Sequence, residues 1–286
     1  MCLIAFALHA DPGCPLLIAA NRDEFLDRPT EALHRWTLAD GTDIVAGRDL
    51  RDGGTWLGLS PRGRVAMLTN VRQTHAGPGP RSRGELVTRW LQGHGDEIDE
   101  DRLAATIDPG AYGGFNLVVG DFHRHRWTWL SNRHPDAPHE SAGAGQLYRK
   151  ALQAGVYGLS NASLDTPWPK TQRLKQAVAN ALVGLHGRAA ADDWLQPLAR
   201  TLTDRTQVDA PDLPHTGVPD DLERALSSPF VHMPGRAYGT RSSLVVSARP
   251  GAGEGWEVRM DEWTHDHAAL DGPLEAVPHR RETLVW

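Results

Sequence analysis

Strand-like segments lie at both ends of this 286-residue chain, and helix-like segments lie in its middle. Apolar runs over residues 2–8 and 16–20 flank the turn signal Asp11-Pro12-Gly13, which predicts an N-terminal hairpin. Two more strand-like runs, GTRSSLVVSA and GWEVRMDEW, lie near the C-terminus. Strands from the two ends can pair in one shared sheet, so this order predicts a single α+β domain over residues 1–286.

The segments between these ends add strands and then helices. Strands are predicted over 43–46, 55–60 and 64–70, a helix over 83–91, and a strand pair that turns around 122–125. DTPWPKTQRLKQAVANAL predicts a long helix with Asp165 or Thr166 as its cap. ADDWLQPLARTLTD predicts a second helix, which Pro197 either kinks or forces to start later. A third, short helix is predicted in PDDLERALSS.

Composition excludes several classes of function. The net charge of −6 argues against a protein that binds nucleic acid by neutralising phosphates. No apolar run approaches the roughly 20 residues needed to span a bilayer. Two cysteines make no disulfide framework. We therefore expect a cytoplasmic protein with a small-molecule ligand or substrate, without a membrane span; its oligomeric state is left open.

The thiol of Cys2 gives the opening stretch three competing interpretations: a secretion signal, a buried hairpin or a catalytic amino terminus. A short apolar run with no preceding cation and no small-residue cleavage site argues against the signal. Aminopeptidases remove an initiator methionine before a small residue, and the α-amine thereby freed on Cys2 titrates near neutrality, so it can serve as the base for its own thiol. A small buried hydrophobe is the structural alternative.

A cluster of polar residues, Asn21, Arg22 and Asp23, follows the returning strand of the predicted hairpin. If the two strands pair, this cluster lies near the level of Cys2. The aspartate could then hold the α-amine, and the arginine could polarise the thiolate or bind an anionic substrate. A solvated charged turn is the alternative.

Three further residues could complete such a site. Asn70 and Asn161 each end a predicted strand, where a side-chain amide can donate to a developing oxyanion. Turn chemistry alone also places asparagine there. Arg241 precedes an apolar strand and could bind a carboxylate ligand, or simply form a surface ion pair.

Histidine and tryptophan provide weaker indications. His123 with His125, and His265 with His267, each supply only half of a metal site, so we expect no metal. The ten tryptophans could line an apolar ligand site, although core packing is their commoner use.

Several blocks together resemble the NRDE family, also called the transport and Golgi organisation protein 2 family. The blocks are NRDEF, GRDLRDGGTWLGLSPRGRVAMLTNVR, SRGELV, YGLSNASLDTPWPKT and GTRSSLVV. This resemblance implies a fold of the Ntn-hydrolase type: a four-layer αββα sandwich with two packed antiparallel sheets flanked by helices.

The chain is also distantly similar to cysteine amidases of that fold, such as penicillin V acylases and bile salt hydrolases. The similarity implies that Cys2 is the nucleophile, Asp23 orients the amine and Asn161 binds the oxyanion, with Asn70 and Arg241 matching more loosely. One departure stands out: those amidases place an arginine before the asparagine of the second strand, whereas here Arg22 follows it.

Two functions are therefore expected as alternatives. The first is an N-terminal-cysteine amide hydrolase or acyl transferase, with Cys2, Asp23, Asn161 and Asn70 as catalytic residues. In it Arg22, Asn21 and Arg241 bind substrate, and no cofactor is required. The second is a non-enzymatic carrier of haem, acyl-coenzyme A or lipid in the same cleft, as the association of this family with haem and lipid trafficking implies.

Overall fold

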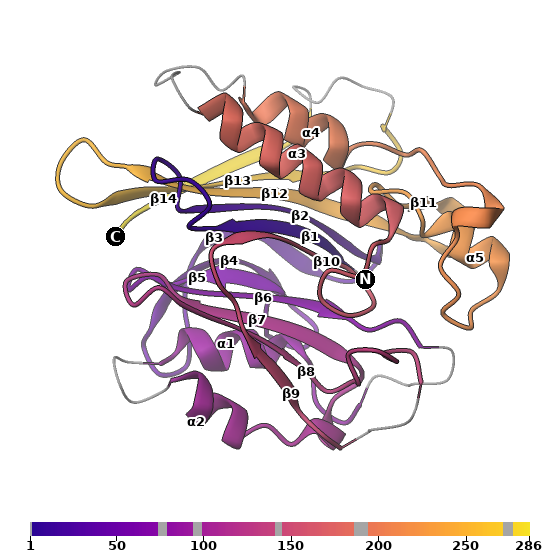
Figure 1. Ribbon diagram of the computed structural model, residues 1–286, viewed down its shortest axis with the longest axis horizontal. Helices are drawn as coiled ribbons and strands as arrows, with labels where there is room; N and C mark the ends of the chain where they lie inside the picture. The colour runs from indigo at the N-terminus through magenta and orange to yellow at the C-terminus, as the bar shows by residue number, and fades with distance from the viewer. Residues whose placement is uncertain (1, 74–78, 94–98, 141–144, 186–193, 271–276) are drawn as a thin grey trace. The chain divides into compact units, whose positions relative to one another are not determined.

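The computed structural model describes residues 2–73, 79–93, 99–140, 145–185, 194–270 and 277–286 (Figure 1). The chain folds into two compact units. Unit 1 comprises Met1–Asp27, Ala154–Ser160 and Asp165–Trp286, and unit 2 comprises Arg28–Gln153 and Asn161–Leu164. Among the described residues, no helix is both long and apolar enough to cross a membrane.

A seven-stranded antiparallel sheet forms the framework of unit 1, in the order β10-β1-β2-β12-β13-β14, with β11 paired to β12. Strands from the two ends of the chain thus pair in one sheet, as the sequence predicts. The strands are β1 (Cys2–Leu8), β2 (Leu16–Phe25), β10 (Gly155–Leu159), β11 (His232–Met233), β12 (Tyr238–Pro250), β13 (Trp256–Thr264) and β14 (His279–Val285).

The N-terminal hairpin of β1 and β2 forms as predicted, with Leu8 paired to Leu16 and Cys2 paired to Arg22. Its turn is closed by Asp11, whose Oδ1 accepts hydrogen bonds from the backbone N–H groups of Gly13 at 2.8 Å and Cys14 at 3.1 Å. A short side chain that bonds to nearby backbone groups is what such a turn requires.

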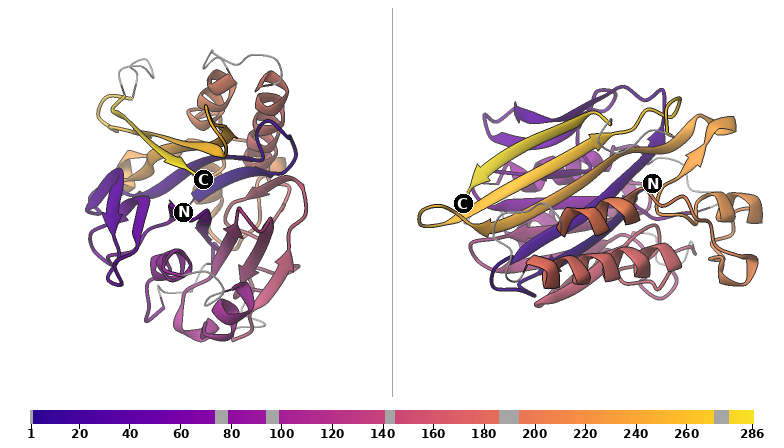
Figure 2. Two further views of the ribbon diagram at one scale, coloured as in Figure 1. Left: turned by 90° about the vertical axis from the view of Figure 1, so that its left-hand side faces the viewer. Right: turned by 90° about the horizontal axis from the view of Figure 1, so that it is seen from above.

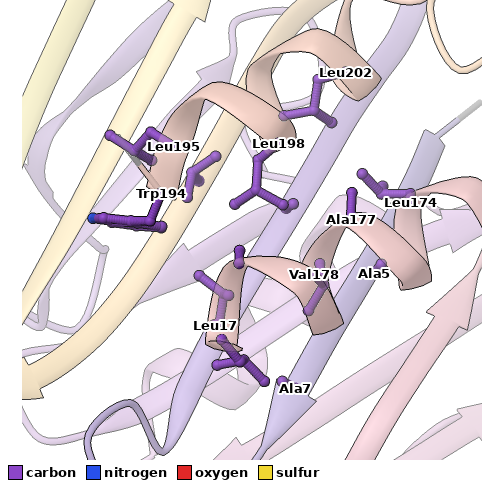
Figure 3. Packing of buried hydrophobic residues seen from close by; sticks show 14 of the residues in the cluster. Ala5, Ala7, Leu17, Leu174, Ala177, Val178, Trp194, Leu195, Leu198 and Leu202 are labelled. Carbon is purple, nitrogen blue, oxygen red and sulfur yellow. The ribbon is translucent and has the colours of Figure 1, made fainter. Parts of the chain in front are cut away.

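Helices α3 (Pro169–Leu185) and α4 (Leu195–Leu202) cover one face of this sheet (Figures 1 and 2). Ala5 and Leu17 on the hairpin lie with Val178 of α3 and Leu198 of α4 in one buried apolar cluster (Figure 3). Pro197 lies in the first turn of α4, so of the two predicted effects of this proline, the later start is confirmed. The short helix α5 (Asp220–Ala225) also forms.

The predicted cap of the long helix is wrong. Helix α3 begins at Pro169, and Asp165 lies four residues earlier with a positive φ of 60°. Its Oδ1 instead accepts the backbone N–H of Gly158 at 2.8 Å and the ammonium of Lys175 at 2.6 Å. Asp165 therefore ties the start of this segment back to β10.

Unit 2 contains a second seven-stranded antiparallel sheet, in the order β3-β4-β5-β6-β7-β8-β9. The strands are β3 (Thr30–Thr37), β4 (Asp43–Asp49), β5 (Leu57–Leu59), β6 (Arg64–Asn70), β7 (Phe115–Asp121), β8 (Arg126–Ser131) and β9 (Tyr148–Ala151). His123 and His125 lie in the turn between β7 and β8, where the sequence predicts that this strand pair turns.

Helices α1 (Gly84–Leu91) and α2 (Glu100–Ala105) contribute to the core of unit 2. Trp90 of α1 packs with Leu103 of α2 and Leu117 of β7 in a single buried cluster. Short 3-10 turns occur at Pro109–Ala111 in unit 2 and at Ala210–Asp212 and Pro234–Arg236 in unit 1. The predicted α+β class with two antiparallel sheets is therefore confirmed.

Candidate active site

Cys2 is the first residue of β1, and its cross-strand partner on β2 is Arg22. Side chains of directly paired residues lie on the same face of a sheet. Leu3 and Ala19 face the helices, so alternation along the strands places Cys2 and Arg22 on the opposite face. Arg22 also forms an ion pair with Glu24 at 3.9 Å. An arginine placed after the asparagine of β2 thus still shares a face with the thiol.

The electrostatics of Cys2 combine opposing effects. Burial raises the pKa of the thiol above its ordinary value, and the nearby carboxylate of Asp23 raises it further. The positive charge of Arg22 lowers this pKa, as does the backbone N–H of Asp23, which donates to the sulfur. Because burial is the largest effect, the thiol of Cys2 is neutral at pH 7 and needs a base before it can act as a nucleophile.

Asp23 is buried and held from the neighbouring strand β12. Its partner in the register is Thr240, whose Oγ1 donates to Oδ1 of Asp23 at 2.7 Å. The same hydroxyl accepts the backbone N–H of Val231 at 2.8 Å, which fixes the direction of its proton. The hydroxyl of Tyr238 donates to the backbone carbonyl of Asp23 at 3.0 Å. The carboxylate beside Cys2 is therefore fixed by dedicated partners.

Asn21 is fully buried and engaged inside the protein. Its Nδ2 donates to the carbonyls of Leu202 at 2.7 Å and Pro229 at 3.0 Å, and its Oδ1 accepts the hydroxyl of Ser243 at 2.6 Å. His265 Nε2 lies 2.8 Å from the same Ser243 oxygen. Because the Ser243 hydroxyl already donates to Asn21, His265 Nε2 is the donor in this second bond. These bonds hold β2 in place. Binding of substrate by Asn21 stays a prediction.

Arg241 lies at an irregularity of β12, where the pairing with β2 shifts between Thr240 and Ser242. Its Nη1 donates to the carbonyl of Phe25 at 3.1 Å, and its own carbonyl accepts the backbone N–H of His265 at 2.9 Å. The guanidinium is thereby positioned at the end of β2 that carries Asp23. Binding of a substrate anion by Arg241 stays a prediction.

The two asparagines predicted to bind an oxyanion both belong to unit 2, and the structure brings them together. Asn70 ends β6, and its backbone carbonyl accepts Nδ2 of Asn161 at 2.9 Å. The carbonyl of Asn161 in turn accepts the backbone N–H of Arg72 at 2.8 Å. One N–H of the Asn161 amide therefore holds the end of β6.

The family model described as Transport and Golgi organisation 2 matches residues 1–262. The chain belongs to the Transport and Golgi organisation 2 family. The family resemblance seen in the sequence is therefore confirmed, and the match spans most of the chain.

Curated relatives from this family match at similar levels. The Transport and Golgi organization protein 2 homologs of Bos taurus and Homo sapiens are 34% and 32% identical over 257 and 260 residues. Each alignment covers 86% of this chain and 88% of the relative. Transport and Golgi organization protein 2 of Drosophila melanogaster is 30% identical over 264 residues, covering 86% and 87%.

Two solved structures with a weaker likeness carry the names of hydrolytic enzymes. The Caenorhabditis elegans N-acylethanolamine-hydrolyzing acid amidase ortholog aligns with a TM-score of 0.45 at 11% identity, covering 79% of this chain and 97% of that one. A variant of conjugated bile acid hydrolase from Clostridium perfringens aligns with a TM-score of 0.41 at 9% identity, covering 99% and 97%. Both scores lie below 0.5 and give no residue-level correspondence.

In this member of the Transport and Golgi organisation 2 family, sequence reasoning missed the residues that support Cys2 and Asp23. Thr240 lies within the quoted block GTRSSLVV and Tyr238 directly precedes it, but their roles show only once β12 is known to pair with β2. Ser160, in the quoted block YGLSN, donates its hydroxyl to the carbonyl of Cys2 at 3.1 Å. The sequence alone does not indicate which distant strands pair, so the roles of these residues could not be predicted from it.

Charge changes beside Cys2 should alter its rate of alkylation in a predictable direction. Arg22→Gln removes a charge that lowers the thiol pKa, so alkylation by iodoacetamide at pH 8 should slow by about three- to tenfold. Asp23→Asn removes a charge that raises this pKa and should speed the reaction. Peptide mapping resolves Cys2 from Cys14, whose pKa burial raises to about 12 and which should react equally slowly in all variants. Equal rates at Cys2 in the three proteins would contradict this account.

Proposed function

We propose that this protein is an N-terminal-cysteine amide hydrolase or acyl transferase acting on carbon–nitrogen bonds. The observation that carries the proposal is the placement of Cys2 at the start of β1, opposite Arg22 and beside a carboxylate that Thr240 holds. A thiol, a cation and a fixed carboxylate are the groups that such a nucleophile needs around it. The raised pKa of the buried thiol makes a neighbouring base necessary.

The reaction proposed begins after loss of the initiator methionine. The α-amine of Cys2 takes the thiol proton, and the sulfur attacks the amide carbonyl to form a tetrahedral intermediate. Asp23 orients the resulting ammonium, which returns the proton to the leaving nitrogen as the carbon–nitrogen bond breaks. Water, or an acceptor amine, then attacks the thioester and regenerates the thiol. Asn161 and Asn70 are kept as proposed oxyanion donors on the sequence resemblance alone.

The first test is the mass of the intact purified protein. We expect loss of one methionine residue, because a base on Cys2 exists only when its α-amine is free. A protein that retains its methionine quantitatively cannot use this mechanism, and the carrier of haem, acyl-coenzyme A or lipid then becomes the better proposal. A cytoplasmic location belongs to the same proposal.

The second test measures release of amine from a panel of N-acyl amides. Cys2→Ala should reduce turnover by about a thousandfold or more, since the covalent route disappears. Cys14→Ala is the matched control, because Cys14 is also buried and donates its thiol to the carbonyl of Leu16 at 3.3 Å. Turnover that survives in Cys2→Ala and not in Cys14→Ala would overturn the assignment.

A further inference from the structure

A buried arginine in unit 2 donates to two neutral groups. Arg133 is 9% exposed; its Nε donates to Oε1 of Gln73 at 2.9 Å and its Nη1 to the carbonyl of Asn132 at 2.9 Å. Among the residues that the structure describes, no carboxylate forms an ion pair with Arg133. Burial alone lowers its pKa, with no acid to oppose the effect. An isolated buried guanidinium is costly unless a negative charge accompanies it.

Gly114 lies close to Arg133 and also accepts a hydrogen bond from a second arginine. A side-chain carbon on Gly114 would lie 3.1 Å from Oε1 of Gln73 and 3.3 Å from Nε of Arg133, so the guanidinium stem packs directly over this backbone. The carbonyl of the same glycine accepts Nη1 of Arg83 at 3.2 Å and the backbone N–H of Val71 at 2.9 Å. Arg83 therefore bonds to this glycine, and Nε of Arg133 lies close beside it.

A third arginine, Arg72, lies on the segment that bonds to Gly114 through Val71. Arg72 follows Val71 directly, precedes Gln73 and is 5% exposed. Its backbone is held at both ends, because its N–H donates to the carbonyl of Asn161 and its carbonyl accepts Nδ1–H of His139, each at 2.8 Å. Together with the bond from Val71 N–H to the carbonyl of Gly114, these contacts fix the segment that carries Arg72 and Gln73. We call Arg72, Arg83 and Arg133 the arginine corner.

Two acids lie close to this corner in the sequence, and among the described residues neither forms an ion pair with Arg133. Glu85, on the first turn of α1, accepts the hydroxyl of Tyr112 at 2.5 Å and pairs with Arg81 at 2.6 Å. Glu140 contributes its backbone carbonyl to Gln73 at 3.4 Å, and within the described ranges its carboxylate forms no ion pair. Among the described residues, no carboxylate therefore balances the charge of Arg133.

We propose that the arginine corner binds an oxyanion, a carboxylate or phosphate group carried by a small molecule. Planar guanidinium groups match both anions with paired N–H donors, and a bound anion supplies the negative charge that Arg133 lacks. Neutral donors such as Nε2 of Gln73 can share the remaining oxygens. This site is independent of chemistry at Cys2, so it stands whether or not the protein hydrolyses amides.

Calorimetric titration of the full chain with inorganic phosphate, and separately with acetate, tests the proposal at constant ionic strength. We expect saturable binding of at least one anion against a chloride background, and Arg133→Met should weaken it about tenfold or more. Arg149→Met is the matched control: it removes the same charge from unit 2, where Arg149 is exposed and pairs with Asp101. Tighter binding of phosphate than acetate identifies a phosphate ligand, and the reverse identifies a carboxylate.

Two further variants keep the test decisive. Arg83→Met should weaken binding as well, and it replaces Arg133→Met if the latter does not fold. Cys2→Ala should bind the anion with unchanged affinity, which separates this site from the proposed reaction. No binding above the chloride background, or equal affinity in Arg133→Met and Arg149→Met, would overturn the proposal.

Discussion

Replacing Trp90 with alanine should lower the free energy of unfolding by about 3–5 kcal/mol. Trp90 is 2% exposed and fills the core of unit 2 between α1 and the sheet. Its Nε1 donates to the carbonyl of Gly120 at 3.1 Å, and the guanidinium of Arg64 lies 4.4 Å from its ring centre. The variant therefore loses apolar burial and leaves a buried cation without its aromatic partner. Urea denaturation followed by far-UV circular dichroism measures the change.

Trp36 offers a matched control in the same unit. It too lies beneath an arginine, Arg48, at 4.7 Å, and its Nε1 donates to the carbonyl of Ala46 at 3.2 Å. However, Trp36 is only partly buried, so Trp36→Ala should cost less than half as much. Equal losses in the two variants would show that burial in the α1 core does not set the stability of unit 2.

Acidification should destabilise the protein through His265. Burial lowers the pKa of this imidazole from 6.5 to about 4, and the charges of His267 and Arg205 lower it in the same direction. A group whose pKa is depressed in the folded state stabilises that state above its unfolded pKa. The contribution is therefore present above pH 6.5 and is lost as pH falls towards 4, by up to about 3 kcal/mol. Urea midpoints measured at pH 7.5 and pH 4.5 give the size of the loss.

His265→Gln should flatten this pH dependence, because glutamine can still donate to Ser243 but does not titrate. The control is His34→Gln in unit 2, since the imidazole of His34 is partly exposed and pairs with Glu31 at 3.4 Å. It should keep the acid sensitivity of the wild type. If His265→Gln loses as much stability between pH 7.5 and 4.5 as the wild type, the buried imidazole is not the acid-sensitive group.

Local patterns predicted the elements with clear apolar periodicity. The N-terminal hairpin, the helix α3 and the C-terminal strands β12 and β13 are where the sequence placed them, because each buries a continuous apolar face. The strands β3, β9 and β14 escaped detection. All three lie at sheet edges and expose charged side chains, as the sequence HRRETLV of β14 illustrates. Edge strands carry such residues to avoid further pairing, and this conceals them from a hydrophobic pattern.

Part of the candidate site could be predicted from the local sequence, and the rest depends on contacts between segments that are distant in the chain. Hairpin geometry alone brings Arg22 and Asp23 to the level of Cys2, so this group could be predicted. The support from Thr240 depends on a strand more than two hundred positions away, and no local pattern indicates which strands pair. The internal partners of Asn21 are distant too: its bonds to the carbonyls of Leu202 and Pro229 become visible only in the folded chain.

The pairing of β2 with β12 also has a consequence for synthesis. The bond from Tyr238 to Asp23 spans 215 positions. Strand β2 therefore has to wait to pair with β12 until most of the chain has left the ribosome. At elongation rates of about 5–20 residues per second, that wait is roughly ten to forty seconds. During this time an apolar hairpin has an unpaired strand edge and no covering helices for part of the interval. The nascent protein should therefore depend on chaperones that shield its first strands until translation ends.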